Sequence, residues 1–143
     1  MRGNENCGLH MNGDVNMGGD GVITGALIEG NLAADNGATG GSSINCDGVQ
    51  DSVIRHNLVK DAHASGISLY RIDGGAASTG NLVHGNVVIV ARDGRSAINV
   101  QDASVRNRVI GNVLVVKNPE RAIIDVSRDS RRGFEARGNH EGR

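Results

Sequence analysis

Short alternations of apolar and polar residues recur along the chain, and this period of two predicts β-strands. One series of such strands reads GLHM (8–11), SINC (43–46), GISL (66–69), AINV (97–100) and IIDV (123–126). In a second series, two apolar strands flank an asparagine, as in NLVHGNVVIV (81–90) and NRVIGNVLVV (107–116). Because no segment keeps the spacing of an amphipathic helix over several turns, we expect an all-β protein with three short strands per repeat.

The asparagines of the second series mark a repeat. They are Asn31, Asn57, Asn86, Asn112 and Asn139, separated by steps of 26, 29, 26 and 27 residues. A hairpin meander would need a turn signal at each return. One coil per repeat instead stacks equivalent strands in parallel, about 4.8 Å apart, and several stacked coils bury a common interior. The pattern therefore predicts one domain over residues 1–143, a parallel β-helix of about five coils.

The repeated asparagine is expected to form a structural corner. Stacked side-chain amides can donate to and accept from their neighbours, which gives an Asn ladder. We expect asparagine there because it tolerates a positive φ, with a preceding glycine such as Gly85 or Gly111 loosening the backbone.

The phrase N-x-V-x-G-N-V-V at 81–88, with variants at 52–59 and 107–114, resembles the repeat of right-handed parallel β-helix proteins of the pectin-lyase-like superfamily. The stretches 12–23, 44–49 and 63–75 resemble uncharacterised bacterial β-helix repeat proteins, many of them exported. The resemblance implies a single-stranded right-handed parallel β-helix. The superfamily contains polysaccharide lyases, uronate epimerases, glycosidases and structural fibres, so the fold alone does not choose among these functions.

Composition excludes several other classes of protein. A net charge of −1 gives no reason to expect nucleic acid or an anionic membrane as a partner. No apolar run approaches the roughly 18 residues of a membrane span, and MRGNENCG is not a signal peptide, which leaves the localisation open. Cys46 takes an inward strand position typical of a small buried hydrophobe, and Cys7 lies too far along the strand to bridge to it.

The ends of the predicted coil stack bear on assembly. The first and last coils would leave strand edges and apolar interior surface open. We therefore expect a homo-oligomer, most simply a two-fold dimer.

The strands of the first series (8–11, 43–46, 66–69, 97–100 and 123–126) are called the I-x-V strands. In the resembled superfamily, ligands bind along the sheet that corresponds to these strands. Its outward positions form two polar columns: His10, Asn45, Ser68, Asn99 and Asp125, and then Asn12, Asp47, Tyr70, Gln101 and Ser127. A solvated sheet face explains polar columns equally, but these contain no Lys, Arg or Glu and suit the recognition of sugar hydroxyls. The predicted polysaccharide-binding residues are His10, Asn45, Asp47, Ser68, Asn99 and Gln101.

The strongest catalytic candidates are His63, Tyr70 and Arg71. On a uronate polymer, Arg71 could neutralise the carboxylate and acidify the adjacent C5 proton. Tyr70 or His63 could then serve as base and acid for β-elimination or epimerisation. The alternative is that the loop histidine and arginine are simply solvated.

Acidic residues in the loops beside this sheet suggest a cation site. They are Asp14, Asp20, Asp47 and Asp73. Ca²⁺ takes six to eight oxygen ligands, and the resemblance to pectate-lyase-like proteins implies Ca²⁺ as a cofactor. Aspartate beside glycine is also ordinary turn chemistry, because its side chain caps the backbone.

Three functions therefore remain open. The chain could be a polysaccharide-binding module, an active uronate lyase or epimerase, or a structural protein that only assembles into oligomers.

Overall fold

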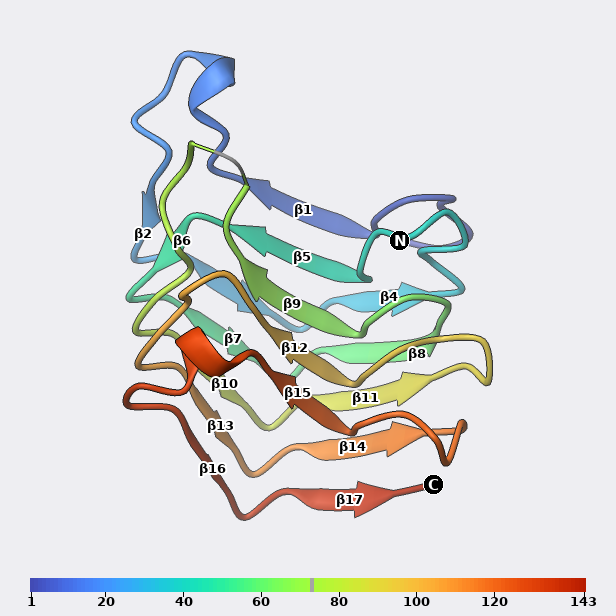
Figure 1. Ribbon diagram of the computed structural model, residues 1–143. Helices are drawn as coiled ribbons and strands as arrows, with labels where there is room; N and C mark the ends of the chain where they lie inside the picture. The colour runs from blue at the N-terminus through green and yellow to red at the C-terminus, as the bar shows by residue number, and fades with distance from the viewer. Residues whose placement is uncertain (73) are drawn as a thin grey trace.

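The chain winds into a stack of coils whose equivalent strands form three parallel five-stranded sheets (Figure 1). The computed structural model describes residues 1–72 and 74–143, apart from the side chain of Met17. Every strand of these sheets pairs in parallel with a strand one repeat away. The predicted all-β class, the period and the parallel β-helix of about five coils are confirmed.

Each repeat contributes one strand to each sheet. The I-x-V sheet contains β1 (Leu9–Asn12), β5 (Ile44–Asp47), β9 (Ile67–Tyr70), β12 (Ile98–Val100) and β15 (Ile124–Val126). The sheet before the asparagine corner, here the pre-corner sheet, contains β3 (Leu27–Glu29), β7 (Val53–Arg55), β10 (Leu82–His84), β13 (Arg108–Ile110) and β16 (Glu135–Arg137). The post-corner sheet contains β4 (Leu32–Ala34), β8 (Leu58–Ala62), β11 (Val87–Val90), β14 (Val113–Val116) and β17 (His140–Gly142).

The remaining elements are short. Strands β2 (Ile23–Thr24) and β6 (Val49–Gln50) form a separate parallel pair that the sequence pattern did not predict. Two 3₁₀ helices, η1 (Val15–Met17) and η2 (Arg128–Ser130), lie in loops. Over residues 1–72 and 74–143, neither has the length or apolar character needed to cross a bilayer.

The interior consists of like residues stacked on like. Ile44, Ile67 and Ile98 are in register on neighbouring coils and are fully buried. Cys46 is fully buried in register with Met11 and Leu69, which confirms its role as a small core residue. Burial raises the pKa of the Cys46 thiol to about 12, and both cysteines are free.

The asparagine corner forms the predicted ladder. Each side-chain amide donates to the Oδ1 of the next asparagine: Asn31 to Asn57 at 3.0 Å, Asn57 to Asn86 at 2.9 Å, Asn86 to Asn112 at 3.0 Å and Asn112 to Asn139 at 3.0 Å. The backbone N–H of each donor residue reaches the same oxygen. All four steps therefore run in one direction, from the N-terminal coil toward the C-terminal coil.

The reason given for asparagine at this corner is corrected by the backbone. The residue in the left-handed region is the one before the asparagine: Gly30, His56, Gly85, Gly111 and Gly138, with φ between 52° and 66°. The ladder asparagines themselves are not among the positive-φ residues of the described chain. The asparagine is needed for its amide, which bonds along the stack, and the left-handed conformation is adopted by the preceding residue, a glycine in four coils and His56 in the fifth.

Two further polar stacks were not predicted. Asn81 donates to Asn107 Oδ1 at 3.0 Å, and the Ser52 N–H donates to Asn81 Oδ1 at 3.1 Å. At another corner, the Ser78 N–H donates to Ser104 Oγ, and Ser104 repeats this contact with Ser130. The same step of 26 residues relates Asn81 to Asn107 and each serine to the next, so a wider search of the repeat could have found them.

The two ends of the stack differ. At the N-terminal end, Ala34 on β4 donates its N–H to Met1 O at 2.9 Å and accepts from Gly3 N at 3.0 Å, so residues 1–3 cover that strand edge. At the other end, Ile124, Val126, Arg131, Phe134 and Ala136 line a cavity of about 250 Å³. Phe134 is partly buried there and packs against the core.

Candidate functional site

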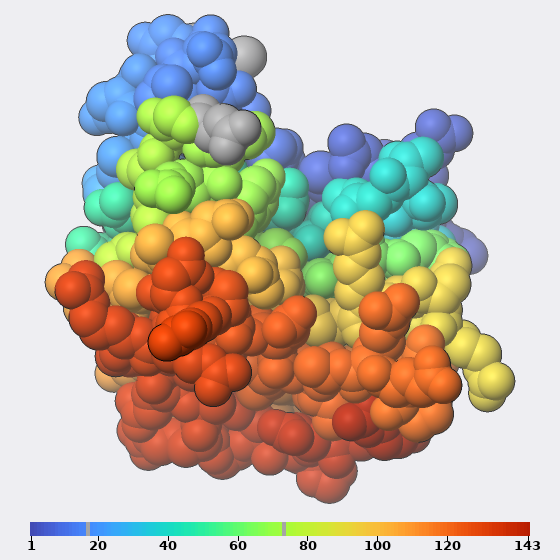
Figure 2. Space-filling model, viewed as in Figure 1, coloured from blue at the N-terminus to red at the C-terminus, as the bar shows by residue number. Residues whose placement is uncertain are grey.

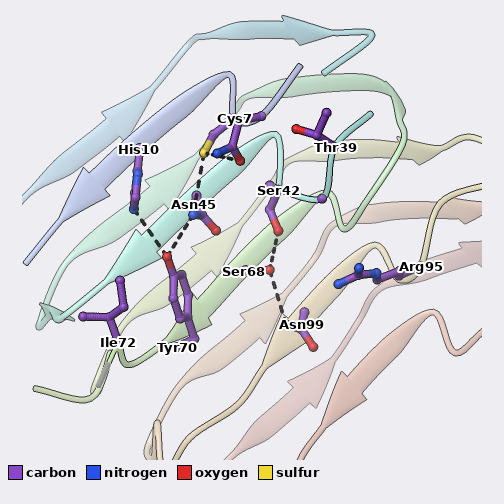
Figure 3. Close-up of a pocket in the computed structure, with 13 residues that line it drawn as sticks. Cys7, His10, Thr39, Ser42, Asn45, Ser68, Tyr70, Ile72, Arg95 and Asn99 are labelled. Carbon is purple, nitrogen blue, oxygen red and sulfur yellow. Dashed lines mark hydrogen bonds between the residues drawn. The ribbon is translucent and has the colours of Figure 1, made fainter. Parts of the chain in front are cut away.

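A groove of about 490 Å³ lies over the I-x-V sheet (Figure 3). Strands β1, β5, β9 and β12 form its floor, and residues from the loops at 6–7, 39–42 and 95 border it. The I-x-V strands place alternate side chains inward, and the intervening polar ones face the groove. The sequence pattern thus predicts the polar side chains on the floor of the groove.

Five residues of the two predicted columns line this groove. They are His10, Asn45, Ser68, Asn99 and Tyr70. The first four are in register on consecutive coils, as predicted. The predicted alignment is confirmed, while ligand binding by these residues stays a prediction.

Tyr70 is the centre of a hydrogen-bond network in the groove (Figure 3). Its Oη accepts a hydrogen bond from Asn45 Nδ2 at 2.9 Å and lies 3.4 Å from His10 Nε2. Partial burial and the nearby Asp47 carboxylate raise the pKa of Tyr70 to about 12, against a smaller lowering by the Asn45 bond. The phenol is therefore protonated at neutral pH and is a weaker acid than a free tyrosine.

Asp47 and Gln101, two predicted binding residues, do not line the groove. Asp47 is fully buried beneath the loop after β9. Its Oδ1 accepts a hydrogen bond from the backbone N–H of Ile72 in that loop at 2.9 Å. Its Oδ2 has no hydrogen-bond partner among the described residues. Gln101 Nε2 donates to Asn99 Oδ1 at 2.8 Å, so Gln101 positions Asn99.

The predicted catalytic trio is not assembled at the groove, where only Tyr70 is present. His63 Nδ1 lies 2.9 Å from Asp93 Oδ2, in a pair that lowers the pKa of the Asp93 carboxyl. Arg71 is exposed and does not line the groove. His63 precedes β9 and Tyr70 ends it, so these two residues lie at opposite ends of one strand.

Several groove residues were missed because they lie in loops outside the repeat. Arg95 is exposed at the groove and makes no ion pair with any carboxylate of residues 1–72 and 74–143. The Ser42 and Ser68 hydroxyls lie 2.6 Å apart. Cys7 Sγ accepts a weak bond from Asn45 Nδ2 at 3.7 Å, and partial burial raises the pKa of this thiol.

The predicted Ca²⁺ ligands are not brought together in the described part of the chain. Asp14 Oδ1 accepts the N–H of Asn16 at 2.8 Å, and Asp20 Oδ1 accepts that of Val22 at 3.0 Å, so both cap their own turns. Asp73 lies outside the described residues. Among the others, no three His, Cys, Asp or Glu side chains group to hold a metal ion. The described residues therefore do not fit the cation.

No protein-family model, curated protein or solved structure matches the chain. The fold and the groove define the class of protein, a parallel β-solenoid of about five coils with a polar groove on one sheet.

Proposed function

We propose that this protein binds a polysaccharide in the groove over the I-x-V sheet. The observation that carries the proposal is the lining. Amide, hydroxyl and imidazole groups surround a groove of about 490 Å³, and no carboxylate is present among its described lining residues. Polysaccharides are also the substrates of the lyases, epimerases and glycosidases in the superfamily that the repeat resembles.

The groove chemistry suits sugar hydroxyls. An amide such as that of Asn45 or Asn99 both donates and accepts, as does a sugar hydroxyl. The half-buried Tyr70 ring adds an apolar surface with a polar tip. Arg95 adds a cation that can form a bidentate pair with a carboxylate, which favours an acidic polymer over a neutral one.

The chain contains its own reporter for this proposal. Tyr70 is the only tyrosine, there is no tryptophan, and Tyr70 lies in the groove. Its fluorescence should change when oligomers of galacturonate, mannuronate or glucose bind, and calorimetry then gives the dissociation constant. Loss of one hydrogen-bonding group in Asn45→Ala should weaken binding roughly 3- to 10-fold.

The charge preference has a matched control. Arg95→Ala should weaken binding of the acidic oligomers and leave the neutral one unchanged. Arg92→Ala removes another exposed arginine of the same loop that does not line the groove, and it should change neither. Absence of binding to all three oligomers, or equal effects of the two arginine variants, would refute the proposal.

A second candidate is a uronate lyase or epimerase, favoured by the 3.4 Å approach of His10 Nε2 to Tyr70 Oη. In β-elimination, His10 would take the C5 proton, the C4–C5 double bond would form, and the C4–O bond would break. Tyr70, protonated because its pKa is about 12, would give its proton to the departing oxygen. Arg95 would hold the substrate carboxylate.

This candidate is tested by the unsaturated product. Incubation with polyuronates, with and without Ca²⁺, should raise absorbance at about 235 nm if elimination occurs. Epimerisation is detected separately, as exchange of the C5 proton in D₂O. His10→Ala and Tyr70→Phe should remove either signal, whereas His63→Ala should keep it. The absence of both signals would remove this candidate.

A further inference from the structure

The outer face of the post-corner sheet carries an apolar column. Leu32, Leu58, Val87 and Val113 occupy the same outward position on β4, β8, β11 and β14 and are in register from coil to coil. These four residues are called the apolar column below. It runs along the stack on a different sheet from the groove.

This column is unusually open to solvent. Five large hydrophobic side chains are exposed in the described part of the chain, and three of them belong to the column: Leu32 at 55%, Leu58 at 41% and Val113 at 37%. Parallel sheets normally have both faces covered. A contiguous row of exposed apolar side chains on a soluble domain marks an interaction surface.

We propose that a second copy of this chain covers the apolar column, with the two stacks antiparallel about a two-fold axis. An axis between Leu58 and Val87 places Leu58 against the partner's Val87 and Leu32 against the partner's Val113. Each contact then occurs twice, as in any isologous interface. The partners also supply a polar rim, because Lys60 and the Lys117–Asp61 ion pair lie beside the column.

Charge supports a second copy in this orientation. Residues 1–31 carry four acidic side chains and one basic one, whereas residues 113–143 carry seven basic and five acidic ones. These segments lie at opposite ends of the stack (Figure 2). An antiparallel pair brings the acidic end of each copy beside the basic end of the other, while a parallel pair sets like charges together.

The proposal is tested by the mass in solution and one matched pair of variants. Sedimentation of the full chain over about 1 to 200 µM should show a dimer that dissociates on dilution. Leu58→Asp should raise the dissociation constant roughly 30-fold or more, as loss of a central hot spot does. Leu27→Asp is the control, because Leu27 is 57% exposed but lies on the pre-corner sheet, and it should leave the dimer intact.

The orientation is tested by crosslinking in a Cys7→Ser background, which leaves only the buried Cys46. A tagged Leu32→Cys chain mixed with an untagged Val113→Cys chain should form a disulfide-linked heterodimer, whereas Leu32→Cys alone should not crosslink. Both variants and the parent must show the same circular dichroism. A monomer at the highest concentration, equal effects of Leu58→Asp and Leu27→Asp, or crosslinking of Leu32→Cys to itself would each overturn the proposal.

Discussion

The Asn86 side chain should contribute more to stability than its small size suggests, because it is hydrogen-bonded to the asparagine on either side of it in the ladder. Its Oδ1 accepts from Asn57 N at 3.0 Å and Asn57 Nδ2 at 2.9 Å, and its own amide donates to Ile54 O and Asn112 Oδ1. The residue is fully buried. Asn86→Ala therefore removes these four bonds, where water does not reach, and a longer, partly buried one from the Asn86 amide to His84 O at 3.2 Å.

The expected loss follows from the groups left without partners. Both Asn57 donors lose their acceptor, and Ile54 O loses one donor, while Asn112 Oδ1 keeps the backbone N–H of residue 86. At about 1–3 kcal/mol for each of the two Asn57 donors left without an acceptor, Asn86→Ala should lower the free energy of unfolding by roughly 2–6 kcal/mol. That is a large part of the roughly 5–15 kcal/mol typical of a domain.

Asn31→Ala is the matched control at the end of the ladder. Its Oδ1 accepts no hydrogen bond from the described residues, and Asn57 Oδ1 would keep the backbone N–H of residue 31. We expect a loss of about 1 kcal/mol for this variant. Urea unfolding followed by circular dichroism measures both free energies. The reasoning is refuted if the two variants lose equal stability, because burial and two-sided bonding would then be irrelevant.

Three other predictions concern single side chains. Because the pKa of Tyr70 is about 12 in the folded chain and 10.0 in its unperturbed state, the unfolded chain loses this proton first. Stability should therefore fall as the pH rises from about 10 through about 12, and Tyr70→Phe should remove that part of the fall on alkaline denaturation curves. Cys7 at the groove should react with a thiol reagent while buried Cys46 does not, and a bound oligosaccharide should slow the reaction, which a spectrophotometric thiol assay measures. Gly111→Ala, at φ 64° in open space, should lower the free energy of unfolding in urea by about 1 kcal/mol. Gly66→Ala should lower it further, because the new Cβ would overlap Val88 Cγ1, and equal losses for the two variants would contradict this packing.

The sequence predicted the features that the repeat itself encodes. The asparagine spacing gave the coil, and the I-x-V phrase gave the alignment of His10, Asn45, Ser68 and Asn99, because stacked coils repeat one residue environment at one period. The same logic could have found Asn81 and Asn107. It could not assign the left-handed residue at the corner, since asparagine and glycine are adjacent and both tolerate that conformation.

The groove itself was only half predictable. Strand periodicity fixes which side chains leave the sheet, but it does not place the loops that then border or cover them. Arg95 and Cys7 reach the groove from segments without a repeat, and Asp47 is covered because the loop containing Ile72 lies over it. Contacts between loops of different coils depend on three-dimensional packing that no local pattern reports.

The position of the first residue bears on how this protein should be handled. The Met1 ammonium donates to Leu32 O at 2.8 Å, within the first strand that carries the apolar column. Any extension placed ahead of Met1 would replace that ammonium with an amide and emerge beside Leu32. A purification tag there would lie beside the apolar column and could block the dimerisation that the sedimentation experiment measures. The tag should therefore be attached after Arg143.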